Sequence, residues 1–305
     1  MLHFVVFSFN RADFLRHCID TVERCASGFP ILIVDDNSTD AGTVKALDEL
    51  SLRHRVVQPE KDNNGLRSKH GGLYGNMQLA LDYLNDDDLM CTLQDDMQLV
   101  RIFTADEAEA LQSWFTADST RGFVHHAFLK GSERLRSQVS FNETDGLYYN
   151  KRVKSSAGAW YSDIFIASVA TLRKAGWQFQ AREALNEQLA RGLFSPMAHW
   201  RDPFVAWLPA ATSWRGKRRT FALRLGEKLN DCGFYPLQEM GSAAERAFKM
   251  RAHDVMPYAE DFLSIRSEQT VRKAPDKPWI YHPLQGRRLL KWLNSLELKL
   301  FARKP

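Results

Sequence analysis

The sequence contains few cysteines and no long apolar run. Its four cysteines form no Cys-x-x-Cys pair, and four in 305 residues are too few for a disulfide framework. No uncharged apolar stretch approaches the ~20 residues that span a bilayer, so the sequence predicts no transmembrane helix. Because the first residues show no basic segment and no small-residue cleavage site, we expect a cytoplasmic protein with reduced thiols.

Two common nucleotide-binding motifs are also absent. The sequence contains neither the Gly-x-Gly-x-x-Gly pattern of dinucleotide-binding folds nor the glycine-rich pattern of P-loop proteins. The first apolar run ends in Ser8-Phe9-Asn10, where a nucleotidyltransferase usually has a glycine-rich loop. These absences disfavour three classes of nucleotide-binding protein.

Charge is unevenly distributed along the chain. The formal net charge of +4 combines a balance of −5 in residues 1–214 with a balance of +9 in residues 215–305. The acidic part can hold a metal ion and disfavours a nucleic-acid partner. The basic part can face an anionic membrane, although a solvated basic face is the plainer interpretation. The change in composition predicts a first domain over 1–210 and a basic, mainly helical extension over 211–305.

Short apolar runs alternate with helical patterns over the first hundred residues. The expected buried strands lie at 4–9, 31–34, 55–58 and 89–93. The expected helices between them begin near Phe14, Val44 and Leu73. This alternation predicts an α/β/α sandwich with a mostly parallel sheet. Beyond it, we expect a helix over 105–118, a strand over 122–129 and a helix over most of 163–177.

Two acidic pairs stand directly after predicted strands. Asp35 and Asp36 follow the second strand, and Asp95 and Asp96 follow the fourth. Ligands bind at the carboxyl ends of parallel strands. Adjacent carboxylates repel unless a cation offsets them, so the later pair favours Mg²⁺ or Mn²⁺ with a diphosphate. The earlier pair suits ribose hydroxyls or a base N–H, while capping aspartates and an Asx-turn are the structural alternatives.

Four ordered motifs resemble those of family 2 GT-A nucleotide-sugar glycosyltransferases. A strand ending in Ser-x-Asn-Arg is present at 8–11, and Val-Asp-Asp-x-Ser-x-Asp at 34–40. Asn64-Gly65 with Asn76 is similar to the family's Asn-x-Gly loop and following helix, and 95–96 is similar to its metal-binding pair. Gln94 stands where the family often has aspartate. The resemblance extends over about residues 3–100.

The resemblance implies a Rossmann-like GT-A fold and a metal-dependent, inverting transfer. The implied donor is a nucleotide sugar, most often UDP-linked, and the implied acceptor is a hydroxyl of a saccharide or cell-surface glycoconjugate precursor. Arg67 is added as a cation that can meet diphosphate oxygens or remain a solvated surface charge. The expected donor-binding residues are Ser8, Asn10, Asp35, Asp36, Arg67 and Asp95, and the expected ligands of Mn²⁺ or Mg²⁺ are Asp96 and Asp95.

Inverting transfer also needs a carboxylate that takes the proton of the acceptor hydroxyl. Glu183 is our first candidate, because Gly-Trp-x-Phe at 176–179 followed by a glutamate is similar to the family's pattern. Asp163 is the second, since two aromatic residues precede it and can stack on a sugar. The structural alternatives are a helix cap for Asp163 and an exposed i, i+4 pair for Glu183 and Glu187.

Three histidines are weighed as possible metal ligands. His125 and His126 lie on a predicted strand, so they point to opposite faces and do not grip one ion together. His199 lies where some GT-A enzymes supply a late histidine to the metal. We expect a partly buried structural histidine there.

The C-terminal part ends in an amphipathic helical pattern. Leucines and Phe301 recur at helical spacing in 286–301, flanked by arginine and lysine. Such a helix can lie peripherally on an anionic membrane, pack on its own domain or pair with a second copy, and packing is the default interpretation. Because Gln94 departs from the family pattern, a GT-A-like protein without catalytic activity that binds a carbohydrate or partner is the alternative function.

Overall fold

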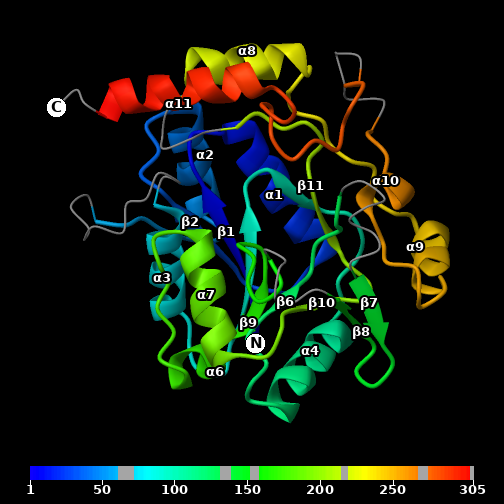
Figure 1. Cartoon of the computed structure of the whole chain (residues 1–305). Helices are drawn as coiled ribbons and strands as arrows, with labels where there is room; N and C mark the ends of the chain where they lie inside the picture. The colour runs from blue at the N-terminus through cyan, green and yellow to red at the C-terminus, as the bar shows by residue number, and fades with distance from the viewer. Residues whose placement is uncertain (61–71, 131–138, 152–157, 214–218, 267–273, 303–305) are drawn as a thin grey trace.

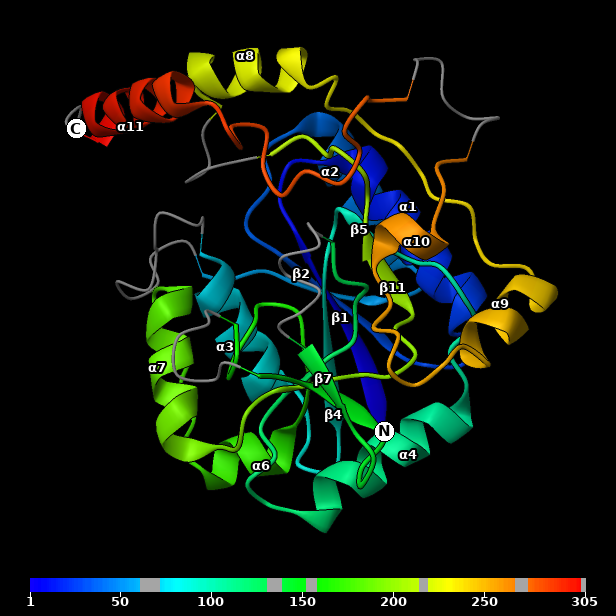
Figure 2. The same cartoon turned by 45° about the vertical axis from the view of Figure 1, so that its right-hand side comes forward.

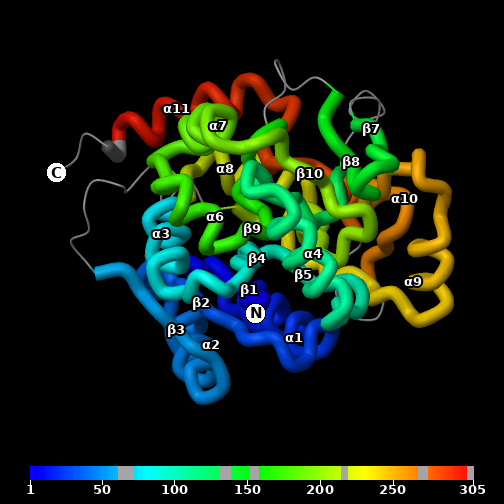
Figure 3. Tube along the Cα trace, turned by 90° about the horizontal axis from the view of Figure 1, so that it is seen from below, coloured from blue at the N-terminus to red at the C-terminus, as the bar shows by residue number. Residues whose placement is uncertain are grey.

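The computed structural model describes residues 1–60, 72–130, 139–151, 158–213, 219–266 and 274–302. The main strands are β1 (Leu2–Ser8), β2 (Ile31–Asp35), β3 (Arg55–Val57), β4 (Leu89–Gln94), β6 (Val124–His125), β7 (Val139–Asn142), β8 (Leu147–Asn150), β9 (Ile166–Ser168) and β10 (Ala198–His199). They form one sheet in the order β3-β2-β1-β4-β9-β6-β10-β8-β7. Helices cover both faces of this sheet (Figure 1; Figure 3).

The predicted mixed α/β fold with a mostly parallel central sheet is confirmed. β1 lies between β2 and β4 and runs parallel to both, and β3 extends the parallel half beyond β2. The helices that connect or flank these strands are α1 (Ala12–Cys25), α2 (Ala41–Ser51), α3 (Leu73–Tyr83), α4 (Ala105–Ala117), α6 (Val169–Lys174) and α7 (Glu183–Leu193). The order of strand and helix therefore follows the sequence pattern through β4, whereas the short strand at 97–99 was not predicted.

Two apolar layers hold the sheet in place. Phe4 and Val6 of β1 face the cluster that contains side chains of α1, α2 and α4. Val5 and Phe7 face the opposite cluster, which contains side chains of α3, α6 and α7. Because successive side chains of a strand point to opposite faces, one uninterrupted apolar run fills both layers.

The far half of the sheet departs from the sequence prediction. The expected helix over most of 163–177 is wrong at its start, because 166–168 forms β9 between β4 and β6 and only 169–174 is helical. A short apolar run that is buried on both faces has no period that separates strand from helix. β7 and β8 pair antiparallel in a region where no element was predicted.

The last third of the chain packs around a second, smaller sheet. β5 (Met97–Leu99) and β11 (Val205–Trp207) pair antiparallel, and Val100 and Phe128 join an apolar cluster with residues from 237–263. The remaining helices are α8 (Phe221–Leu229), α9 (Ser242–Lys249), α10 (Ala259–Phe262) and α11 (Arg288–Ala302). Among the described residues, no helix is long and apolar enough to cross a bilayer. The domain division at residue 210 stays a prediction.

α8 and α11 lie side by side at one end of the molecule (Figure 1; Figure 2). This is the end toward which β1, β2 and β4 point, so the helix pair lies beyond the carboxyl edge of the parallel strands. The four cysteines are buried and none forms a disulfide.

Candidate active site

Both acidic pairs lie at the carboxyl edge of the parallel strands. In the parallel register Ser8 lies opposite Asp35. Asp36 donates its backbone N–H to the carbonyl of Ser8 at 3.0 Å, and Asp95 donates its own to the carbonyl of Phe7 at 3.0 Å. The two pairs, sixty residues apart in sequence, therefore flank the end of one strand.

Asp35 and Asn10 are occupied by the loop that follows β2. The carboxylate of Asp35 accepts hydrogen bonds from the backbone N–H and hydroxyl of Ser38, at 2.7 and 2.5 Å, and from the amide of Gln58 at 2.9 Å. The side-chain oxygen of Asn10 accepts the backbone N–H groups of residues 39 and 40, at 2.7 and 2.9 Å. These bonds are the Asx-type turn chemistry named above as the alternative, and they fix the shape of the loop.

Asp36 lies against the start of α3. A Cβ atom at Gly72 would come within 2.9 Å of the Asp36 carboxylate, and Gly72 has a φ of +91°. Space and backbone conformation both require glycine there. Beside it, Ser8 is 3 % exposed, and its hydroxyl has no hydrogen-bond partner among the described residues. That hydroxyl is therefore available to a ligand.

The second acidic pair is bridged by an arginine that we did not select from the sequence. Arg11 follows β1, and its guanidinium contacts Asp95 and donates to Asp96 at 2.9 Å and to the carbonyl of Thr212 at 3.0 Å. The carboxylates raise the pKa of Arg11 despite its burial, so it stays charged. Burial raises the pKa of Asp95, and Arg11 opposes that rise. The cation that offsets the repulsion of the pair is therefore part of the chain.

Asp96 retains one carboxylate oxygen that fits a metal ion. Its Oδ1 is buried and without a partner among the described residues, and Asp96 lines a cavity of about 260 Å³ with Gln94 and Tyr281. Mg²⁺ needs only one or two carboxylates when substrate phosphates and waters complete its shell. Within the described part of the chain, no group of three His, Cys, Asp or Glu side chains forms a metal cluster. The fit therefore rests on Asp96, with Asp95 held by Arg11.

Asp163 is a buried carboxyl group close to β4. The hydroxyl of Thr92 donates to its carbonyl at 3.1 Å, which places it beside the carboxyl half of that strand. Tyr74 donates to Oδ2 at 3.3 Å, while Oδ1 is buried without a partner among the described residues. Burial and the charge of Glu183 raise the pKa of Asp163 to about 7. Asp163 does not cap the next helix, because Ser168 is the N-cap of α6.

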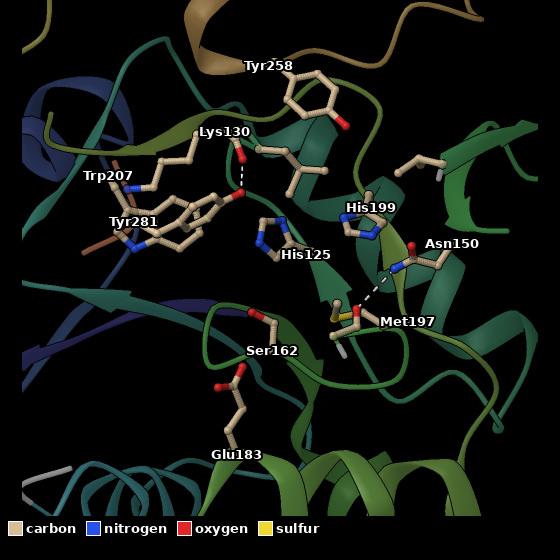
Figure 4. Close-up of a pocket in the computed structure, with 13 residues that line it drawn as sticks. His125, Lys130, Asn150, Ser162, Glu183, Met197, His199, Trp207, Tyr258 and Tyr281 are labelled. Atoms are coloured by element: carbon tan, nitrogen blue, oxygen red, sulfur yellow. Dashed lines mark hydrogen bonds between the residues drawn. The ribbon is translucent and has the colours of Figure 1, made fainter. Parts of the chain in front are cut away.

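Glu183 is the first residue of α7 and lines a second cavity, of about 310 Å³ (Figure 4). Its carboxylate points toward Ser162 and the interior of this cavity. Partial burial and the carboxylate of Glu187 raise its pKa. The alternative of an exposed i, i+4 pair is wrong for Glu187, which is 9 % exposed and accepts the backbone N–H groups of 159–161 at 2.8 to 3.3 Å.

Lys130 stands between the two cavities and lines both. β6 runs parallel to β4, since both are antiparallel to β9, so the chain after β6 reaches the same edge of the sheet. The Lys130 ammonium lies 5.3 Å from the ring centres of Trp207 and Tyr281 and donates to the carbonyl of Ile280 at 3.3 Å. Burial lowers the pKa of Lys130 to about 8. The strand-end rule would have selected this residue had it been applied beyond residue 100.

Two buried histidines face each other in the second cavity (Figure 4). The rings of His125 and His199 are 5.2 Å apart, and both nitrogens of His199 lack a partner among the described residues. Burial lowers the pKa of His199 to about 4, so the ring is neutral at pH 7. His126 points away and stacks on Phe204 at 5.3 Å, so the two adjacent histidines do face opposite sides.

One predicted contact lies outside the described residues. Arg67, Lys69 and the Asn64-Gly65 loop all fall within 61–71. The predicted donor and metal residues Ser8, Asn10, Asp35, Asp36, Asp95 and Asp96 are brought to one edge. The two candidate bases lie beyond them, on the β9 side of β4.

Residues 4–155 match the model of a family described as glycosyl transferase family 2. No protein of curated function matches the sequence at a significant level. Among solved structures, S. aureus TarS has 13 % identity and a TM-score of 0.48, and the match covers 68 % of this chain and 36 % of TarS. This chain therefore spans little more than a third of TarS.

Two further structures have lower TM-scores. A mannosyltransferase, PcManGT from Pyrobaculum calidifontis, solved with GDP-Man and Mn²⁺, has 13 % identity and a TM-score of 0.42, with 82 % of this chain and 65 % of that chain covered. The galactosyltransferase LgtC, solved with donor and acceptor sugar analogs, has 12 % identity and a TM-score of 0.41, with 96 % and 95 % covered. The family match includes β1, β2, β4 and both acidic pairs, and residues 4–155 belong to glycosyl transferase family 2.

Proposed function

We propose that this protein is a glycosyltransferase that moves a sugar from a nucleotide diphosphate sugar to a hydroxyl group of an acceptor. The observation that carries the proposal is the position of the two acidic pairs, which flank the end of β1 within the family 2 region. The proposed donor is UDP-linked, and the proposed acceptor is a saccharide or glycoconjugate precursor.

The donor's nucleoside is assigned to the β1–β2 side of the edge. The carboxylate of Asp36 would accept hydrogen bonds from the ribose or base, and the hydroxyl of Ser8 would donate or accept one, because both residues lie at the strand ends. Asp35 and Asn10 act beneath them by holding the loop after β2. Arg67 is kept as a proposed contact of the diphosphate.

The diphosphate is assigned to the cavity that Asp96 lines. Asp96, with Asp95 beside it, would hold Mn²⁺ or Mg²⁺ through its unpartnered oxygen. When bound, such an ion stabilises the negative charge that grows on the leaving diphosphate. Arg11 offsets the repulsion between Asp95 and Asp96, and Lys130 lies on the wall of the same cavity.

The acceptor is assigned to the cavity that Glu183 lines. Neutral His125 and His199 can hydrogen-bond sugar hydroxyls there. Glu183 takes the proton of the attacking hydroxyl, the new glycosidic bond forms at the anomeric carbon, and the bond to the diphosphate oxygen breaks. In the proposed reaction the acceptor hydroxyl attacks opposite the diphosphate and the anomeric centre is inverted; Lys130 lines both the donor and the acceptor cavity.

A panel of nucleotide sugars tests this proposal by thermal shift, with and without Mn²⁺. Stabilisation follows affinity, so one nucleotide sugar should raise the melting temperature most, and more with Mn²⁺ than without it. Asp96→Asn should abolish the part that depends on Mn²⁺. Asp87→Asn is the matched control, since Asp87 is exposed just before the amino end of the same strand.

Analysis of the reaction product and of donor turnover then distinguishes an enzyme from a binding protein. NMR of the product of the best donor should show an inverted anomeric configuration. Donor binding without transfer or hydrolysis, under Mn²⁺ and with a range of acceptors, would favour the inactive carbohydrate-binding alternative. No stabilisation by any nucleotide sugar would contradict the donor site itself.

A further inference from the structure

The helices α8 and α11 form an antiparallel pair that is fixed by polar contacts. The carboxylate of Glu297 accepts the first backbone N–H groups of α8, from Phe221 at 3.1 Å and Ala222 at 3.0 Å. Thr220, the N-cap of α8, donates to buried Asn294 at 2.6 Å. The other end of α8 packs on the segment before α11, where a Cβ atom at Gly226 would meet Leu284. The pair is therefore a built surface, not a loose tail.

Both helices expose an apolar stripe. Leu289 is 82 % exposed, Trp292 63 % and Leu300 65 %, and these residues recur at helical spacing on the outer side of α11. Phe221 and Leu229 of α8 are 57 % and 51 % exposed. Isolated exposed leucines are ordinary, but these large side chains are gathered on two neighbouring helices.

The exposed charged side chains within these two helices are all positive. On α8 they are Arg224 and Lys228, and on α11 they are Arg288, Lys291 and Lys299. The acidic side chains of the two helices are already engaged: Glu227 contacts Arg219 and accepts the N–H of Ser213, both before α8, and Glu297 caps α8. The surface thus combines an apolar stripe with a basic margin on each helix.

We propose that the outer surface of α8 and α11 docks on an anionic lipid membrane. An apolar stripe with arginine and lysine at its margin matches the acyl boundary and the anionic headgroups of such a membrane. A second copy of the chain fits less well, because contact between two identical surfaces would bring the five cations of each against the other. The lipid surface is the occupant whose charge complements the patch.

The position of the patch would bring the candidate active site close to the membrane. The segment 280–283 lines the cavity of Asp96, and its end packs under α8 through Pro283. The helix pair also lies beyond the carboxyl edge of the parallel strands (Figure 2). Tyr281 of this segment also lines the cavity assigned to the acceptor. Docking through α8 and α11 would therefore bring both cavities toward the headgroups, where, on the proposed function, a lipid-linked acceptor would be found.

Co-sedimentation with vesicles tests the proposal on the full chain. We expect binding to vesicles of equal parts phosphatidylcholine and phosphatidylglycerol at low ionic strength, and little binding to phosphatidylcholine alone. Arg288→Gln and Lys291→Gln should each weaken the binding about fivefold. The double variant Leu289→Ser/Trp292→Ser should weaken it roughly tenfold or more, because it removes the largest apolar area.

Matched variants at the opposite end of the molecule serve as controls. Lys174→Gln removes an exposed charge from α6, and Leu52→Ser removes a side chain that is 86 % exposed between α2 and β3, at the amino edge of the parallel strands. Both should bind vesicles like the unaltered protein. Thermal melting of all variants, and donor-dependent stabilisation in the absence of lipid, should remain unchanged, since none of these side chains lies in a cavity described above.

Three outcomes would overturn the proposal. No binding to the anionic vesicles, or equal binding to both kinds of vesicle, would remove the anionic membrane as the occupant. If the charge variants on α6 and α11 weakened vesicle binding equally, the binding would depend only on the net charge of the protein and not on this surface. A dimer in light scattering that becomes a monomer on Leu289→Ser/Trp292→Ser, without vesicle binding, would assign the patch to a second copy.

Discussion

The two sides of the carboxyl edge satisfy their polar groups in different ways. On the side of β1 and β2, Asp35 accepts three hydrogen bonds from its own loop and from Gln58, and Arg11 bridges the next acidic pair. On the side of β6 and β10, the rings of His125 and His199 and one oxygen of Asp163 are buried without a full set of partners among the described residues.

This difference shows how far the chain itself supplies hydrogen-bond partners on each side. A buried polar group without a partner costs about 1–3 kcal/mol. Such groups persist where a ligand or water completes them. On the donor side the chain therefore holds Asp35 and Asp95 itself and leaves only single atoms, such as the Ser8 hydroxyl and Oδ1 of Asp96, for a ligand. On the acceptor side whole rings are left without a full set of partners among the described residues, so more hydrogen-bonding capacity remains for a substrate. Changes on the acceptor side should affect turnover and pH response, whereas loss of Arg11 on the donor side should affect stability.

The largest expected effect is on turnover, at Glu183. Glu183→Gln keeps the shape of the side chain but removes the proton acceptor, so kcat should fall by roughly 10²–10⁴-fold. Stabilisation by the donor should stay unchanged, because Glu183 lines the other cavity. Single-turnover kinetics with the donor found in the thermal-shift panel would measure this.

Asp163→Asn decides between the two candidate bases. If Glu183 is the base, Asp163→Asn should retain most of the turnover and change its pH profile near pH 7, where burial and Glu183 place the pKa of Asp163. Normal turnover in Glu183→Gln together with collapse in Asp163→Asn would reverse the assignment.

A second prediction concerns stability on the donor side. Arg11→Met leaves two carboxylates next to each other without their buried cation, and breaking a buried ion pair costs about 3–5 kcal/mol. Urea denaturation should show this loss, and Mn²⁺ should recover more stability in Arg11→Met than in the unaltered protein. Arg16→Met is the control: its partner Glu49 is 48 % exposed, so the loss should stay below about 1 kcal/mol. Equal losses in both variants would contradict the role given to Arg11.

The parallel half could be predicted from the sequence because its strands are continuous apolar runs that end in polar clusters. The acidic pairs were found by the same pattern. Arg11 lies within the first motif, but no local rule of the sequence states that a side chain after β1 reaches residues 95 and 96. The repulsion between those carboxylates indicated a cation, and only the fold shows that a guanidinium is already there.

The acceptor side could not be predicted, because its elements are short and their partners are distant. β6 and β10 have two residues each, and β9 has three. Such strands carry too little pattern to separate them from helix or loop. Lys130 and His199 line the same cavity only because β6 pairs with β10, a strand more than seventy residues later in the sequence.

The smallest expected effect is the pH dependence of stability that His199 contributes. The folded protein holds this ring neutral, with a pKa of about 4, whereas the unfolded chain takes up a proton near 6.5. Below about pH 6.5 the unfolded state therefore binds more protons, and the free energy of unfolding falls as the pH decreases toward 4. Between pH 7 and pH 5, the free energy of unfolding should fall on the order of 2 kcal/mol less in His199→Asn than in the unaltered protein, as measured by urea denaturation. His253→Asn is the control, because His253 is exposed and keeps its contact with water in both states. An unchanged pH dependence in His199→Asn would mean that water reaches the ring, and the acceptor cavity would then be more open than its buried histidines indicate.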